Sequence, residues 1–136
     1  MSIWDLYAQH RISPEITSSI RYADVVRLLG ELQAIRPESM ALRELGHSYE
    51  GRSIQLATLG NGSKKVFAWS QMHGNEPTHT AVLFDLINFM QRSPEHPVAK
   101  GILESCTLYL LPMLNPDGAE RYTRRNAQAI DINRDA

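Results

Sequence analysis

The sequence predicts an α/β fold in which helices flank a mixed β-sheet. Its apolar pattern alternates between helical spacing and short strand-like runs, in the order helix, hairpin, strand, helix and strand, which is typical of layered α/β domains. Hydrophobic residues make up 43% of the 136 residues and charged residues 21%, as in ordinary globular domains. The length suits one domain, and no internal repeat or low-complexity run divides it.

Two helices are expected before the first strand. Residues 2–10 have the pattern of a short amphipathic helix, which Pro14 interrupts. Apolar residues then keep helical spacing across residues 22–36 until a proline stops the pattern. We therefore expect residues 1–37 to form a helical lead-in and residues 40–136 to carry the strands and the motif-bearing loops.

Short apolar runs bounded by glycine, proline and polar residues predict the strands that follow. The first two are expected to pair as a hairpin, and the next two are compact enough for buried strands. A strong helical stripe separates the two buried strands, and a turn closes the second of them. The expected hairpin covers 42–45 and 53–59, the buried strands 66–69 and 106–114, the helices 77–92 and 97–104, and the turn 115–118.

Charge and cysteine content limit the classes of partner. The 14 Lys and Arg nearly balance the 15 Asp and Glu, so the net charge is −1 and argues against a nucleic-acid or anionic-membrane surface. The single cysteine, Cys106, cannot form an internal disulfide. Residues 1–7 lack the pattern of a signal peptide, and no apolar run approaches the ~20 residues of a membrane span. We therefore expect a soluble, cytoplasmic protein.

One histidine and one glutamate have the spacing of metal ligands. His73 and Glu76 form an H-x-x-E pair directly after the expected strand 66–69, at the point where the chain turns into a helix. A neutral imidazole nitrogen and a carboxylate oxygen are suitable zinc ligands. Since a catalytic zinc site typically has three protein ligands, this pair would need one more from elsewhere.

Three other residues could be confused with that pair. His47 and Glu50 have the same spacing, but they fall in the hairpin turn, where a solvated surface pair is the simpler interpretation. His79 lies three residues beyond Glu76. It could support the ligands or serve as a third one, although a histidine in that position more often lies on a helix surface.

The carboxyl-terminal segment is rich in arginine. Arg124 and Arg134 could each hold a carboxylate or an oxyanion, and Asn133 could add a donor beside them. The alternative interpretation is a solvated basic loop, because Arg121 and Arg125 are part of the same positive run.

Together these motifs resemble the zinc carboxypeptidase family, the carboxypeptidase A/B-like metallopeptidases. That family combines H-x-x-E after a strand with an N-P-D-G turn and an R-x-N-x-x-G-[VI]-D-[LI]-N-R segment. Here the corresponding residues are 73–76, 115–118 and 124–134, and residues 48–54 resemble the early S-x-x-G-R-x-I signature of the family. One departure is Ala129, which stands where the family usually has glycine.

The resemblance implies a zinc-dependent hydrolase on a partial zinc-carboxypeptidase-like (phosphorylase/hydrolase-like) fold. His73 and Glu76 would be the first two ligands of one zinc ion. Arg124 would stabilise the oxyanion, and Asn133 and Arg134 would hold the carboxylate of the substrate. A zinc-bound water would attack a peptide or amide bond near a free carboxylate.

The resemblance also implies that residues 1–136 are the amino-terminal part of a single catalytic domain. The third zinc ligand and the general-base glutamate of the family lie beyond its N-R motif, so we expect this chain alone to be inactive. An unpaired sheet edge could also favour self-association. Two alternatives remain open: an N-acyl amino acid deacylase related to aspartoacylase and succinylglutamate desuccinylase, and a non-catalytic binding module on the same fold.

Overall fold

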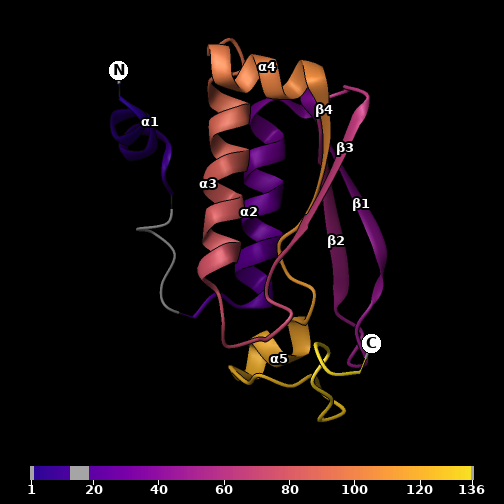
Figure 1. Cartoon of the computed structure of the whole chain (residues 1–136). Helices are drawn as coiled ribbons and strands as arrows, with labels where there is room; N and C mark the ends of the chain where they lie inside the picture. The colour runs from indigo at the N-terminus through magenta and orange to yellow at the C-terminus, as the bar shows by residue number, and fades with distance from the viewer. Residues whose placement is uncertain (1, 13–18, 136) are drawn as a thin grey trace.

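The computed structural model describes residues 2–12 and 19–135, in which helices lie against a four-stranded mixed sheet (Figure 1). Pro14, expected to interrupt the first helix, lies outside the described residues. None of the helices in the described ranges is long and apolar enough to cross a membrane. In chain order the elements are α1 (Ile3–His10), α2 (Tyr22–Ile35), a 3₁₀ turn (Pro37–Ser39), β1 (Met40–His47), β2 (Ser53–Leu59), β3 (Lys64–Trp69), α3 (Thr78–Arg92), α4 (Pro97–Ser105), β4 (Cys106–Leu111) and α5 (Pro116–Arg121).

The strand order is β1-β2-β4-β3. β1 and β2 form an antiparallel hairpin, and β2 pairs antiparallel with β4. β3 pairs with β4 in parallel, so the chain must cross over between them, and α3 and α4 make that connection. The predicted mixed sheet is therefore confirmed.

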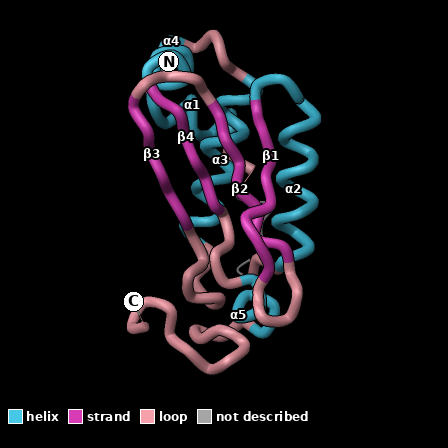
Figure 2. Tube along the Cα trace, turned by 90° about the vertical axis from the view of Figure 1, so that its right-hand side faces the viewer, coloured by secondary structure: helices cyan, strands magenta, loops and turns pink. Residues whose placement is uncertain are grey.

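The hydrophobic core lies between the sheet and the α2–α3 pair. Figures 1 and 2 show both helices on one face of the sheet, with no described helix over the other face. The apolar stripes that predicted these helices provide the core, because their spacing puts them on one side of each helix. Its fully buried side chains include Leu29 of α2, Phe84 and Ile87 of α3, Leu59 of β2 and Leu110 of β4.

Two expectations about the later strands need correction. The apolar run at 66–69 belongs to a strand that is not buried, because β3 is an edge strand and pairs only with β4 in the described sheet. Phe67 is 54% exposed and Trp69 48% exposed.

The expected turn at 115–118 instead begins helix α5. Pro116 suits a first helical turn, and Asn115 caps the helix by accepting a hydrogen bond from the Gly118 N–H at 2.9 Å.

The open edge of β3 leads to a prediction about self-association. Two copies of β3 paired antiparallel would extend the sheet, and this arrangement places the Lys64 and Lys65 pairs of the two copies at opposite ends of the new contact. We expect Phe67→Lys to shift the equilibrium towards monomer in sedimentation velocity. Val26→Lys, at an exposed valine of α2, is the matched control. Identical concentration-dependent sedimentation of wild type and Phe67→Lys would contradict the prediction.

Candidate metal centre

Two loops at the same end of the sheet form the candidate site. Because β3 and β4 run parallel, the segments that follow them emerge side by side. Backbone hydrogen bonds continue this pairing past the strands, from Leu114 N–H to Ser70 O at 3.0 Å and from Asn115 N–H to Gln71 O at 3.0 Å. The first loop carries His73 into α3, and the second leads through α5 towards the arginine segment (Figure 1).

Glycines allow the two loops to pack closely. A Cβ atom on Gly74 would lie 1.9 Å from the backbone carbonyl carbon of Gly118, so only glycine fits there. The Asn115 side chain adds a second link, since its amide donates to the Met72 carbonyl at 3.2 Å. The N-P-D-G segment therefore fixes the position of the loop that carries His73.

His73 is the centre of the cluster. It is 7% exposed, and each ring nitrogen faces a carboxylate: Nδ1 lies 3.1 Å from Glu76 Oε2, and Nε2 lies 3.0 Å from Asp131 Oδ1. We assign the ring proton to Nε2, where it donates to Asp131. This assignment leaves the Nδ1 lone pair beside the Glu76 carboxylate, as expected for two ligands of one metal ion.

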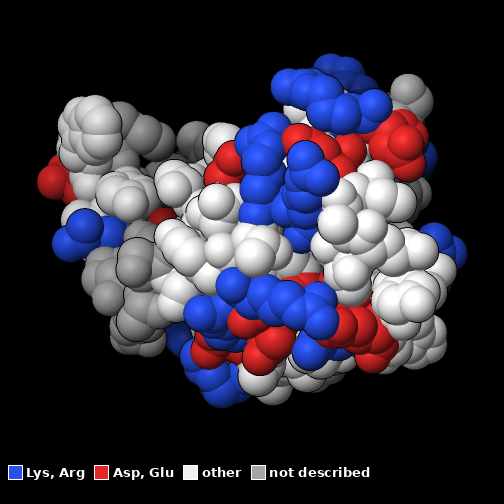
Figure 3. Space-filling view, turned by 90° about the horizontal axis from the view of Figure 1, so that it is seen from below, with Lys and Arg blue, Asp and Glu red and all other residues white. Residues whose placement is uncertain are grey.

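Arg124 joins the same cluster from the second loop, at the end of the molecule where Figure 3 shows basic and acidic side chains side by side. Its Nε donates to Asp131 Oδ2 at 2.9 Å, and its Nη1 donates to Glu76 Oε1 at 3.2 Å. The structure therefore brings together three residues that the sequence motifs singled out, although Glu76 and Arg124 are 48 positions apart.

Asp131 is the site residue that sequence reasoning did not single out. Burial alone would raise its pKa, but hydrogen bonds from His73, Arg124 and the Asn133 N–H outweigh that effect and lower the pKa from 3.8 to about 2. Asp131 is therefore a carboxylate at neutral pH. It orients both the imidazole of His73 and the guanidinium of Arg124.

Asn133 and Arg134 lie at the border of this cluster. Both are exposed, and the Asn133 backbone N–H donates to Asp131 Oδ1 at 3.1 Å. The Arg134 guanidinium donates to the Asn133 carbonyl at 2.9 Å. None of the contacts in the described ranges joins the side chain of Asn133 or Arg134 to His73, Glu76 or Arg124.

The turn before Asp131 forms despite Ala129. Asn126 N–H donates to Ile130 O at 2.9 Å, which closes the turn, and Ala129 adopts a φ of 62°. This left-handed conformation costs a non-glycine residue roughly 1–2 kcal/mol. The backbone here accordingly has the conformation that glycine would favour.

The other candidate histidines do not join the cluster. His47 is exposed, and its Nε2 lies 3.3 Å from Glu44 Oε1. His79 is exposed on the first turn of α3. Glu50 was expected to form a solvated surface pair with His47. Instead its carboxylate accepts hydrogen bonds from Arg52 and Arg121. These interactions lower the pKa of Glu50 and make it a structural member of the hairpin.

Asp117 connects that hairpin to α5. It is 2% exposed and accepts hydrogen bonds from Ser48 Oγ at 2.7 Å, Arg52 Nη1 at 2.7 Å and the Glu50 N–H at 3.1 Å. The early S-x-x-G-R motif and the N-P-D-G motif are thus partners in one buried polar network. They hold the second loop in place and do not take part in the His73 cluster.

The donor set fits two ligands of a zinc ion. His73 Nδ1 and Glu76 Oε2 are adjacent and belong to groups that zinc accepts, and Asp131 supports the imidazole from behind. Within residues 2–12 and 19–135, no group of three or more His, Cys, Asp or Glu side chains is arranged to hold a metal. A typical catalytic zinc site would need a further ligand from outside this set.

The sequence profile of zinc carboxypeptidases matches residues 25–135, which include the whole cluster. The chain belongs to the zinc carboxypeptidase family. It is similar to Carboxypeptidase SOL1 of Arabidopsis thaliana, with 38% identity over 140 residues, 96% of this chain and 28% of that protein.

Solved structures of zinc carboxypeptidases share the fold. A putative carboxypeptidase A from Shewanella denitrificans has a TM-score of 0.75 and 25% identity, over 83% of this chain and 30% of that one. A metallo-carboxypeptidase from Burkholderia cenocepacia has a TM-score of 0.74 and 27% identity, over 82% of this chain and 32% of that one. The chain spans about a third or less of the length of these proteins.

Proposed function

We propose that this chain provides the first half of the active site of a zinc-dependent hydrolase that cleaves a peptide or amide bond near a free carboxylate. The observation that carries the proposal is the convergence of His73, Glu76 and Arg124 around Asp131. Family membership supports the reaction class, and the donor set supports zinc.

Each residue has a role that follows from its chemistry. His73 and Glu76 would hold the zinc ion, which when bound polarises the scissile carbonyl and lowers the pKa of its water. Arg124 would donate to the oxygen that becomes negative during attack on the carbonyl. Asp131 would keep the imidazole and the guanidinium in position, as its two hydrogen bonds already do.

Asn133 and Arg134 would bind the carboxylate of the substrate. Their side chains are exposed next to the cluster, so a substrate could reach them without displacing core residues. A guanidinium holds a carboxylate through two parallel hydrogen bonds. This pairing would place the bond to be cleaved close to Arg124.

Zinc binding by the isolated chain tests the ligand assignment. We expect weak binding and no hydrolysis, because His73 and Glu76 are one ligand short of a typical catalytic site. In a zinc titration against a competing chelator, His73→Ala should abolish the remaining binding. His47→Ala, which changes a histidine with the same H-x-x-E spacing, should leave it unchanged.

Two outcomes of the zinc titration would contradict these expectations. Tight stoichiometric zinc in the wild-type chain would show that two ligands suffice or that others exist. An equal loss of zinc binding in the His73→Ala and His47→Ala variants would show that the cluster is not the metal site.

The substrate class needs an active enzyme that contains this chain. If that enzyme hydrolysed N-acyl amino acids and cleaved no peptide, the deacylase alternative would replace the peptidase assignment.

A further inference from the structure

The carbonyl end of α5 is capped by a side chain from the segment before α2. Arg21 Nη1 donates to the Ala119 carbonyl at 2.6 Å and to the Glu120 carbonyl at 2.5 Å. Both carbonyls belong to the last turn of α5, where the helix no longer supplies an N–H four residues ahead. Figure 1 shows α5 next to the end of α2 at which the chain enters that helix. Arg21 therefore joins two segments that are 98 positions apart in the sequence.

The same guanidinium contacts the residue that ends α5. Its Cζ lies 5.7 Å from the centre of the Tyr122 ring, within the range of a cation–π interaction. Tyr122 has a left-handed φ of 54°, which turns the chain out of the helix, and the Thr123 N–H then donates to the Gly118 carbonyl at 2.8 Å. Arg124 is the next residue. The direction in which Arg124 leaves α5 is therefore set at Tyr122, and Arg21 contacts both that ring and the carbonyls before it.

Arg21 is itself held in place. Its backbone N–H donates to Asp24 Oδ2 at 2.9 Å, at the first turn of α2. Ile20 is 2% exposed in the core, and its carbonyl accepts a hydrogen bond from Gln71 Nε2 at 3.1 Å. Gln71 Nε2 also donates to the Gly74 carbonyl at 3.0 Å, in the first loop of the candidate site. These two neighbouring residues before α2 are therefore linked to both loops of the site.

We propose that Arg21 is a positioning residue that fixes the loop carrying Arg124, so that its guanidinium meets Glu76 and Asp131. The inference rests on the proposed function, in which Arg124 donates to the oxyanion. It adds a residue that the sequence motifs do not contain, because Arg21 precedes the residues 25–135 that match the zinc carboxypeptidase profile. Arg21 would not touch the substrate and would act only through α5 and the residues that follow it.

Hydrogen exchange in the chain itself tests this contact without an assay of activity. We expect Arg21→Ala to raise the exchange rate of the Thr123 amide about tenfold, because its hydrogen bond to Gly118 opens more often. The amides of β4 should exchange as in wild type. Arg21→Lys should restore most of the protection, since one nitrogen of Arg21 makes both hydrogen bonds and the lysine ammonium can replace it.

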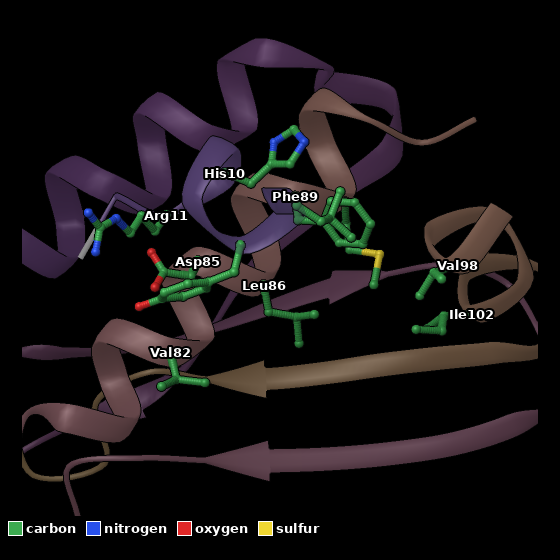
Figure 4. A pocket seen from close by; sticks show the side chains of 11 residues that line it. His10, Arg11, Val82, Asp85, Leu86, Phe89, Val98 and Ile102 are labelled. Carbon is green, nitrogen blue, oxygen red and sulfur yellow. The ribbon is translucent and has the colours of Figure 1, made fainter. Parts of the chain in front are cut away.

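Arg11→Ala is the matched control for the exchange experiment. Arg11 also belongs to the amino-terminal part of the chain, and its guanidinium lies over a tyrosine ring, 5.9 Å from the ring centre of Tyr7. Figure 4 shows Arg11 at a cavity between α1, α3 and α4. Its removal should leave exchange at Thr123 unchanged. Unchanged exchange at Thr123 in Arg21→Ala, or a rise of equal size in Arg11→Ala or across β4, would overturn the proposal.

A double-mutant cycle separates positioning from a general effect on stability. In an active enzyme that contains this chain, we expect Arg21→Ala to lower kcat roughly 10- to 100-fold with much less change in KM, and Arg21→Lys to restore most of it. In the Arg124→Ala background, Arg21→Ala should lower kcat less than about twofold, because Arg21 acts through Arg124.

Equal losses of kcat in the two backgrounds would overturn the positioning role. A wild-type kcat in Arg124→Ala would instead refute the oxyanion role on which the inference rests. The exchange rates in Arg21→Ala distinguish the two failures, since they report the order of the loop and not the reaction.

Discussion

Replacing Arg124 by alanine in an active enzyme that contains this chain is expected to lower kcat about 100- to 1,000-fold, with much less change in KM. Loss of one oxyanion donor has an effect of this size in other hydrolases. The oxyanion develops only as the water attacks, so a donor aimed at it stabilises the transition state more than the bound substrate. Steady-state kinetics on one peptide substrate measures both constants.

Arg125→Ala is the matched control for that prediction. Arg125 is the next residue in the chain and is also exposed, but its guanidinium donates to the Ala129 carbonyl and not to the His73 cluster. We expect its kcat to stay within a fewfold of wild type. Equal losses of kcat in the two variants would mean that the segment acts through its positive charge. A wild-type kcat in Arg124→Ala would show that Arg124 is not the oxyanion donor.

Replacing Asp117 by alanine is expected to lower the free energy of unfolding by about 3 kcal/mol, the cost of breaking a buried ion pair from one side. The variant leaves the Arg52 guanidinium, the Ser48 hydroxyl and the Glu50 N–H without their acceptor. Urea unfolding followed by circular dichroism gives the difference. Glu120→Ala, at an exposed position of the same helix, should change stability by less than about 0.5 kcal/mol.

The same carboxylate predicts an acid dependence of stability. Burial alone would raise the pKa of Asp117, but hydrogen bonds from Ser48 and Arg52 outweigh it and keep the pKa below the ordinary value of 3.8. Its contribution is therefore fully present above that value and is lost as the pH falls through the lower folded pKa. Asp117→Asn should flatten the acid side of the stability curve. A curve parallel to that of wild type would contradict the ion-pair assignment.

Local patterns predicted most of the fold because the core is built from regular spacing. The apolar stripes of α2 and α3, and the hairpin of β1 and β2, lie close to their expected positions. The exposure of Phe67 was not predictable from its own strand, since an edge strand and a central strand can carry the same apolar run. Its position was decided by the strand order.

The site was predictable where motifs specify chemistry and unpredictable where partners come from distant segments. The H-x-x-E spacing indicated His73 and Glu76 as a local pair. The role of Asp131 depends on a contact with a histidine 58 positions earlier, and only the fold shows that contact. Its place in the D-[LI]-N-R segment, two residues before Asn133, was the signal that could have indicated it.

The link between Asp117 and the hairpin has a consequence for folding during synthesis. Asp117 follows Arg52 by 65 positions and Ser48 by 69. At a translation rate of about 5–20 residues per second, the hairpin, which ends at Leu59, is complete roughly 3–12 s before its carboxylate partner is made. During that interval the Arg52 guanidinium has no Asp117 to bind. The hairpin therefore gains its buried ion pair with Asp117 only once α5 has been synthesised.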